Sequence, residues 1–256
     1  MDWPFPLWIA HRGAGKLAPE NTLAAFRHGA ALGWRAFEFD VKLSADGVPF
    51  LLHDTELERT TNGTGKGGEL SWRELSILDA GSWHSAPFAG EAPPTLQAVL
   101  RWGMANGHAL NIEIKPTPGL EQATGLAVGE ICARLWQHTA TPLLFSSFQP
   151  EALQGAASSA PHLARALLLE TLWDGWLPAA QRLGCVAVIT NHALMDAALM
   201  ATLQAHQLRG MCYTVNEAGE AQRLLTLGVH GIITDAVDRF KADAAAPSNA
   251  GLRLAG

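Results

Sequence analysis

The segment FEFDVKLSADGVPFLLHD, residues 37–54, carries titratable side chains where a pair of strands would normally bury apolar ones. These side chains are Glu38, Asp40, His53 and Asp54. The dipeptide Asp46-Gly47 between two apolar runs is typical of a tight two-residue hairpin turn. In such a hairpin Asp40 lies opposite His53, and cross-strand partners project from the same face of the sheet. We therefore expect the hairpin to bring a histidine to the carboxylates of its first strand.

Acidic side chains recur near the ends of two expected strands. Glu38 and Asp40 are two positions apart, as are Glu113 and Lys115, so each pair projects from one face of its strand. If the three carboxylates converge, each pair of charges about 4 Å apart costs about 4 kcal/mol at an effective dielectric constant near 20. Either one carboxylate is protonated or a cation lies among them. Because an all-oxygen set favours a hard ion, we predict one bound divalent cation, Mg²⁺ or Ca²⁺.

Two cationic side chains and two histidines complete this set. Arg12 follows the first expected strand and Lys115 ends the third, and both are suited to holding phosphate oxygens. His11 and His53 can transfer protons near neutral pH. A divalent ion, two anion-binding side chains and two acid/base candidates are what the cleavage of a phosphoester requires.

Other polar residues beside these motifs are expected to orient their neighbours: Glu20, Asp54 and Asp235. Asp235 ends the last expected strand, and we expect it to steady Lys115 or Arg12. Asn21 or Thr22 is expected to cap the helix that follows.

Eight short apolar runs must position these side chains. They cover residues 7–11, 36–41, 110–115, 142–147, 164–169, 186–190, 210–215 and 231–235. The segments between them have apolar residues at three- and four-residue spacing, and often a terminal glycine, which is typical of helices. Eight strands, each followed by a helix, predict a closed (β/α)8 barrel with its site at the C-terminal ends of the strands. An open doubly wound sheet is the alternative, because sequence does not show closure.

Residues 54–95 interrupt this rhythm with a long connection rich in glycine and proline. A connection of this length in a compact domain is usually a functional excursion or a lid. We predict a single domain over residues 1–242 that includes this insertion. The last stretch, residues 243–256, has no periodicity and is expected to be a disordered tail.

The composition excludes several classes of protein. The chain has 256 residues, 48% of them hydrophobic, and its formal net charge of −6 argues against a nucleic-acid partner. It shows no secretory signal and no apolar run of the 18 or so residues that a membrane helix needs. Three cysteines in apolar sequence are expected to be buried free thiols of a reducing compartment: Cys132, Cys185 and Cys212. We therefore predict a cytoplasmic protein with a small-molecule partner, and make no prediction of its oligomeric state.

Five motifs, in order along the chain, resemble those of the glycerophosphodiester phosphodiesterases. They are AHRGAGKLAPENTLAAF, EFDVKLSADGVPFLLHD, NIEIKP, YTVN and GIITDA. The resemblance extends from about Ile9 to Asp235 and is strongest to the cytosolic bacterial enzymes associated with glycerol 3-phosphate uptake. It implies a (β/α)8 barrel whose mouth is capped by residues 54–95.

The resemblance also implies roles for individual residues. Those that match the family's ligands for Mg²⁺ or Ca²⁺ are Glu38, Asp40 and Glu113. His11 and His53 match its acid/base pair. Tyr213 stands where the family commonly has tryptophan, and would line the substrate site. The implied reaction is metal-dependent hydrolysis of glycerophosphodiesters, such as glycerophosphocholine or glycerophosphoethanolamine, to sn-glycerol 3-phosphate and an alcohol.

Three rival functions fit the sequence less well. A phospholipase that attacks lipid-embedded diesters on a similar barrel would need an apolar or basic membrane-contacting surface, and no such stretch is evident. A silent phosphate-ester binding protein would not need both histidines. An amidohydrolase would need a His-x-His pair at the first strand, where this chain has His11-Arg12. Which histidine is the acid, which alcohol is preferred and whether water or the substrate's 2-hydroxyl attacks are left open.

Overall fold

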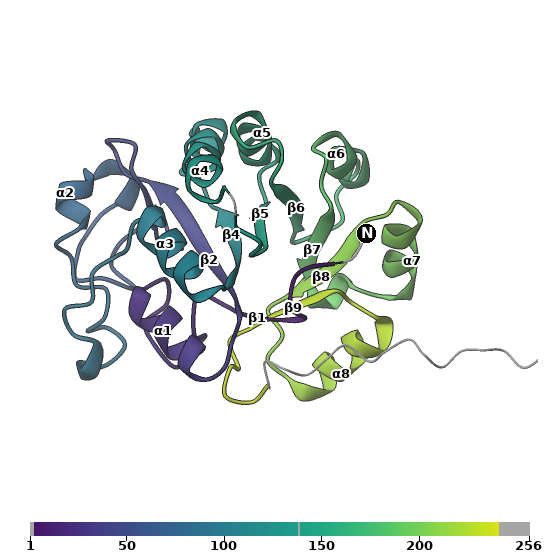
Figure 1. Ribbon diagram of the computed structural model, residues 1–256, viewed down its shortest axis with the longest axis horizontal. Coiled ribbons are helices and arrows are strands. Elements are labelled where there is room, and N and C mark those ends of the chain that lie inside the picture. Colours follow the sequence, from purple (N-terminus) through teal and green to yellow (C-terminus); the bar gives the residue numbers. More distant parts are fainter. Residues whose placement is uncertain (1–2, 138, 241–256) are drawn as a thin grey trace, which may run out of the picture.

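Eight parallel strands form a closed barrel in the computed structural model, which describes residues 3–137 and 139–240 (Figure 1). β1 hydrogen-bonds to both β9 and β2, so the sheet has no open gap. The predicted barrel is therefore confirmed and the open sheet is excluded; the predicted tail lies outside the described residues. The eight strands are β1 (Trp8–Ala10), β2 (Ala36–Leu43), β4 (Ala109–Ile114), β5 (Leu143–Ser147), β6 (Ala164–Leu169), β7 (Ala187–Asn191), β8 (Arg209–Tyr213) and β9 (Gly231–Thr234).

Helices form the outer ring around these strands (Figure 1). The main helices are α1 (Leu23–Ala31), α3 (Leu96–Asn106), α4 (Glu121–Leu135), α5 (Pro150–Ser159), α6 (Trp176–Arg182), α7 (Ala197–Ala205) and α8 (Ala218–Leu227). Local signals set their ends: Thr95 accepts a hydrogen bond from the first turn of α3, and Gly107 ends that helix in the left-handed conformation. Four short helical segments also occur: α2 (Trp72–Leu75), η1 (Gly67–Glu69), η2 (Ala86–Phe88) and η3 (His192–Leu194).

Alternation along β2 decides which of its side chains reach the inside of the barrel. Phe37 and Phe39 face outward and meet Phe26 of α1 edge to face, with ring centroids 5.8 and 5.4 Å apart. Since successive residues of a strand point to opposite faces, Glu38 and Asp40 point inward. The aromatic packing on the outer face thus holds two carboxylates inside the barrel.

The hairpin that follows has a different register from the one expected. Lys42 pairs with Phe50, and Ser44 N–H donates to Val48 O at 3.0 Å, so three residues form the loop rather than two. Gly47 adopts φ +79°, the left-handed position of a three-residue hairpin loop. The predicted pairing of Asp40 with His53 is therefore wrong.

His53 nevertheless reaches the site by another route. Leu52 N–H donates to Asp40 O at 3.3 Å, so Leu52 is the residue that pairs with Asp40. The return strand β3 (Pro49–Leu51) ends before this point, and the chain bends at His53. The bend, rather than cross-strand pairing, brings the imidazole to the C-terminal end of the barrel.

The segment 54–95 and the hairpin together form a small hydrophobic core that is separate from the barrel core. The core consists of Phe50, Leu52, Leu57 and Leu75. Contacts that fasten the segment to the β1–α1 side of the barrel include a hydrogen bond from Ala24 N–H to Glu91 at 3.0 Å, and His84 Nε2, which lies 3.1 Å from Lys16 O.

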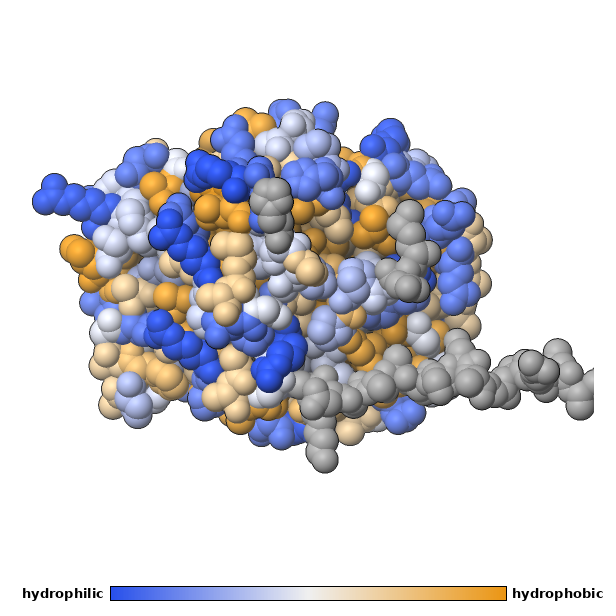
Figure 2. Space-filling view, viewed as in Figure 1, coloured by the Kyte–Doolittle hydropathy of each residue, from blue (hydrophilic) through white to orange (hydrophobic). Residues whose placement is uncertain are grey.

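The described part of the surface shows no large segregated apolar region in the view of Figure 2, and the cysteines are buried. Hydrophilic and hydrophobic residues are interspersed over the face seen in Figure 2. Among the described helices, none is both long and apolar enough to cross a membrane. The cysteines are buried and free as predicted, and burial raises the pKa of Cys185 and Cys212 to about 12.

Gly15 is expected to be the least replaceable of the left-handed glycines near the site. It has φ +55°, and a Cβ there would lie 2.0 Å from the carbonyl oxygen of Asp235. Gly107 has φ +67° with no atom within 4 Å of an added Cβ, so Gly107→Ala measures the conformational cost alone, about 1 kcal/mol. Gly15→Ala should lower the free energy of unfolding by several times as much in urea titrations, because backbone atoms must move. Equal losses in the two variants would contradict a close-approach role.

Candidate active site

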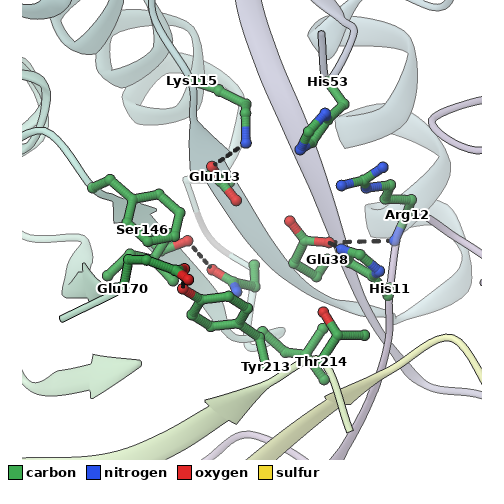
Figure 3. Close-up of a pocket in the computed structure, with 14 residues that line it drawn as sticks. His11, Arg12, Glu38, His53, Glu113, Lys115, Ser146, Glu170, Tyr213 and Thr214 are labelled. Atoms are coloured by element: carbon green, nitrogen blue, oxygen red, sulfur yellow. Dashed lines mark hydrogen bonds and ion pairs between the residues drawn. The ribbon is translucent and has the colours of Figure 1, made fainter. Parts of the chain in front are cut away.

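A cavity of about 270 Å³ opens at the C-terminal ends of the strands, and side chains from several strands point into it (Figure 3). Seven of the eight predicted site residues line it: His11, Arg12, Glu38, His53, Glu113, Lys115 and Tyr213. The eighth, Asp40, is buried directly beside Glu38 and Glu113. The structure thus brings all the predicted residues to one place.

The three carboxylates form a compact buried cluster. Asp40 of β2 and Glu113 of β4 are register partners, and Glu38 lies one pleat earlier on the same face. One oxygen from each carboxylate lies within 4.8 Å of the other two, and the residues are 9% exposed or less. Full charges at such distances repel by about 3 kcal/mol per pair at an effective dielectric constant near 20.

The pKa values in the cluster reflect this crowding. Burial, opposed by His11 but reinforced by the charge of Asp40, raises the pKa of Glu38 to about 8. Burial and Asp40 also raise the pKa of Glu113. A divalent cation would relieve the repulsion, and carboxylate oxygens are the ligands that hard cations prefer. The cluster is therefore suited to holding one.

Arg12 and Lys115 flank the cluster and offset part of its charge. Lys115 Nζ lies 3.0 Å from Glu113 Oε1 and 3.6 Å from Asp40 Oδ1, while Arg12 Nε lies 3.4 Å from Asp40 Oδ2. Although burial opposes it, these two cations hold the pKa of Asp40 well below its usual range. Arg12 itself has φ +50°, a conformation that is rare for a side chain of its size and that occurs mainly at functional sites.

His11 is held by a carboxylate that was expected to act elsewhere. Its Nδ1 lies 2.5 Å from Asp235 Oδ1, and Asp235 is held in turn by Asn216, whose Nδ2 donates to Oδ2 at 3.1 Å. Asp235 was expected to steady Lys115 or Arg12; it is instead hydrogen-bonded to His11, and the charge of Arg12 is a smaller influence on its pKa. β1 and β9 are adjacent parallel strands in matching register, so the residues that follow them become neighbours. Burial lowers the pKa of His11, but the Asp235 hydrogen bond and the charge of Glu38 outweigh it and raise the pKa.

His53 has its own carboxylate partner. Its Nδ1 lies 2.6 Å from Asp54 Oδ1, as the expected orienting role of Asp54 requires. Burial and the positive charges of Arg12 and Lys115 lower the pKa of His53, and the neighbouring carboxylates only partly compensate. In both His11 and His53 a carboxylate engages Nδ1, so Nε2 is the ring nitrogen left for contact with a substrate; in His11 this atom lies 3.7 Å from Glu38 Oε2.

Asn21 has a role in the site that the sequence did not reveal. Thr22, not Asn21, caps α1, because its Oγ1 accepts Ala25 N–H at 3.1 Å. Asn21 adopts φ +58°, and its side chain donates to Asp40 Oδ2 at 2.9 Å and accepts Asp40 N–H at 3.1 Å. A left-handed asparagine is common in turns, so its position gave no local signal of this contact.

Asn111 and Ser146 form a polar floor that was also missed. Asn111 Oδ1 accepts the Ser146 hydroxyl at 2.8 Å, whereas its Nδ2 is buried at the cavity without a hydrogen-bond partner in the described part of the chain. Buried donors are normally paired, so this one is available to a bound molecule. The signal was present: Asn111 precedes Glu113 by two positions and therefore shares its face.

Tyr213 forms one wall of the cavity. Its hydroxyl donates to Glu170 Oε2 at 2.5 Å, and its ring meets Phe148 edge to face at 5.7 Å. Phe148 and Glu170 line the same cavity. This wall combines apolar ring edges with one carboxylate.

Comparisons with known proteins agree with this architecture. The model of the glycerophosphoryl diester phosphodiesterase family matches residues 11–239. A glycerophosphodiester phosphodiesterase of Caldanaerobacter subterraneus is 33% identical over 234 residues, which are 90% of this chain and 93% of that protein. A phosphodiesterase of Oleispira antarctica, solved in complex with the product sn-glycerol-3-phosphate, is 34% identical with a TM-score of 0.86, covering 90% of this chain and 93% of that one. A glycerophosphodiester phosphodiesterase structure from Agrobacterium tumefaciens is 30% identical with a TM-score of 0.77, covering 93% and 100%.

The family match extends over nearly the whole barrel, and the two relatives that are 33% and 34% identical are each covered over 93% of their length. The chain therefore belongs to the glycerophosphoryl diester phosphodiesterase family, whose enzymes cleave phosphodiesters of glycerol.

Proposed function

We propose that this chain hydrolyses glycerophosphodiesters such as glycerophosphocholine and glycerophosphoethanolamine to sn-glycerol 3-phosphate and an alcohol, with one Mg²⁺ or Ca²⁺ bound. The observation that carries the proposal is the buried cluster of three carboxylates beside two cations and two carboxylate-bound histidines in one cavity. The product bound to the Oleispira antarctica phosphodiesterase supports the same product here.

The metal would be held by Glu38, Asp40 and Glu113. When bound, it would act as a Lewis acid on the phosphate and offset the carboxylate charge. Arg12 and Lys115 border the same space, so they would hold the phosphate oxygens as negative charge develops on them.

The surroundings of the two histidines favour different roles. Burial, together with the positive charges of Arg12 and Lys115, lowers the pKa of His53 and favours its neutral ring, so it would take the proton from the nucleophile. His11 is hydrogen-bonded to Asp235, whose negative charge stabilises its protonated ring. It would give a proton to the departing alcohol, which is a poor leaving group as an alkoxide.

Product analysis tests the proposed bond cleavage. Glycerophosphocholine should give sn-glycerol 3-phosphate and choline in equal amounts. The first product is measured with a coupled dehydrogenase assay and the second with a choline oxidase assay. Release of glycerol and phosphocholine would show that the other phosphoester bond is cleaved and would refute the proposal.

Asp235→Asn is expected to lower turnover by about 10- to 100-fold while leaving metal affinity near the wild-type value, because it removes the charge that orients His11 and stabilises its protonated form. The measurement is kcat together with metal titration by calorimetry. Wild-type kcat in this variant would show that Asp235 serves only the packing of the strand ends.

We also propose that the insertion, residues 54–95, covers part of the mouth and shapes the choice of alcohol. Residues 81–90 can be replaced by a short glycine linker, since Ala80 N–H donates to Glu91 O at 2.7 Å and the two ends are already adjacent. The variant should change the ranking of choline, ethanolamine and glycerol esters by kcat/KM. It loses the His84 contact with Lys16 O but keeps the small core formed by Phe50, Leu52, Leu57 and Leu75, and its folding is checked by circular dichroism before the assay. An unchanged ranking in the folded variant would refute this role.

A further inference from the structure

Arg59 joins two carboxylates that lie behind the cavity. Its Nε and Nη2 donate to Asp54 at 2.5 and 3.0 Å, and its Nη1 and Nη2 donate to Glu20 at 2.7 and 2.8 Å. Each carboxylate is therefore gripped by two donors of one planar guanidinium. Paired hydrogen bonds of this kind fix orientation as well as distance.

Each of these carboxylates also binds a side chain that lines the cavity. Asp54 Oδ1 lies 2.6 Å from His53 Nδ1, and Glu20 Oε1 accepts Arg12 Nη1 at 2.8 Å. Continuous contacts therefore run from His53 to Arg12 through Arg59. The two ends belong to different loops, because Arg12 follows β1 and His53 follows β3.

The negative charges of Asp54 and Glu20 explain why a cationic side chain lies between them. Both carboxylates lie within 3.0 Å of the same guanidinium, so without it they would repel each other. The hydrogen bonds from Arg59 lower the pKa of Asp54, and with Arg12 they overcome the effect of burial on Glu20 and lower its pKa as well. The Arg59 side chain is 44% exposed, and an ion pair at such a site adds little to stability. Loss of the Arg59 guanidinium should therefore disturb the orientation of the side chains at the cavity more than it lowers the free energy of unfolding.

We propose that Arg59 is a positioning residue that aligns His53 with Arg12 across the mouth, acting through Asp54 and Glu20. The inference rests on the proposed function, because it works through the proton transfer assigned to His53 and the phosphate contact assigned to Arg12. With Nδ1 of His53 held by Asp54, Nε2 keeps a fixed direction relative to the phosphate that Arg12 would hold.

The test is the Arg59→Gln substitution in two backgrounds. In the wild-type background, kcat for glycerophosphocholine should fall by about 10- to 100-fold, and KM should rise through Arg12. In a His53→Ala background the further loss of kcat should be several-fold smaller, because no imidazole is left to align and only the part that acts through Arg12 remains, while the rise in KM persists. A merely structural role would lower kcat by the same factor in both backgrounds. If Arg59→Gln does not fold, Arg59→Lys, which keeps the charge but loses the paired donors, serves the same comparison.

A matched control exists outside the cavity. Arg223 donates to Glu220 at 2.9 and 2.6 Å, and Glu220 Oε1 lies 2.7 Å from His192 Nδ1, so the same three kinds of side chain are joined in the same way. Arg223→Gln should therefore leave kcat and KM at wild-type values.

Two results would overturn the role of Arg59: wild-type kcat in the Arg59→Gln enzyme, or equal fold-losses of kcat with and without His53. Wild-type turnover in His53→Ala alone would instead refute the function assigned to that histidine.

Discussion

Removal of divalent metal with a chelator is expected to abolish turnover of glycerophosphocholine, and Mg²⁺ or Ca²⁺ should restore it. Three buried carboxylates within 4.8 Å of one another are balanced by only part of the charge of Arg12 and Lys115. Without a cation, this repulsion and the raised pKa of Glu38 oppose full ionisation of the cluster, and its remaining negative charge would repel the substrate's phosphate. Full activity in a thoroughly metal-stripped sample would contradict the assignment.

Substitution of each carboxylate by its amide tests whether that residue is a metal ligand. Glu38→Gln, Asp40→Asn and Glu113→Gln each keep the shape of the side chain but remove one negative charge. Each should weaken metal binding in calorimetric titrations and lower turnover at a fixed metal concentration. Glu58→Gln is a control, since that carboxylate is exposed and accepts the Gly65 N–H within the insertion, away from the cluster. An unchanged dissociation constant in any of the three cluster variants would remove that residue from the ligand set.

His11→Ala and His53→Ala are each expected to lower turnover by about 10² to 10⁴, the usual size of a general acid/base contribution. Metal affinity should stay near the wild-type value, because neither ring is assigned as a ligand. His192→Ala is a control: it removes a histidine with a similar carboxylate partner that does not line the cavity.

A better leaving group distinguishes the two histidines. With a p-nitrophenyl ester the departing anion needs no proton, so His11→Ala should recover most of its activity. His53→Ala should stay slow, because its nucleophile is still not activated. If both variants respond alike to the change of substrate, the division of labour is wrong. If either variant no longer binds the metal, the substituted histidine must be added to the proposed metal ligands.

The order of elements and the members of the site could be predicted because both depend on short-range patterns. Eight apolar runs alternate with segments of helical spacing along the chain, and that rhythm is compatible with few architectures. Alternation along a strand places Glu38 with Asp40, and Glu113 with Lys115, whatever the rest of the chain does. Parallel strands then bring their C-terminal ends together, so residues at those ends must meet.

Partners within the site were decided by tertiary structure alone. Closure sets β1 beside β9, and this pairing brings Asp235 to His11 across 224 positions of sequence. Arg59 meets Glu20 only because the insertion folds back over the β1–α1 loop. Contacts of this range depend on how the elements pack, and no local periodicity encodes them.

The hairpin shows the same limit at short range. Asp46-Gly47 is compatible with a two-residue or a three-residue loop, and the choice depends on which residues take the left-handed conformation. Contacts outside the hairpin bear on that choice, since Trp72 N–H of the insertion donates to Asp46 Oδ1 at 2.8 Å. A shift of one residue reverses the face of every side chain on the return strand. The sequence therefore determined which groups gather at the mouth, whereas packing between distant segments decided how each one is held, because hydrogen-bond partners are chosen by distance in space.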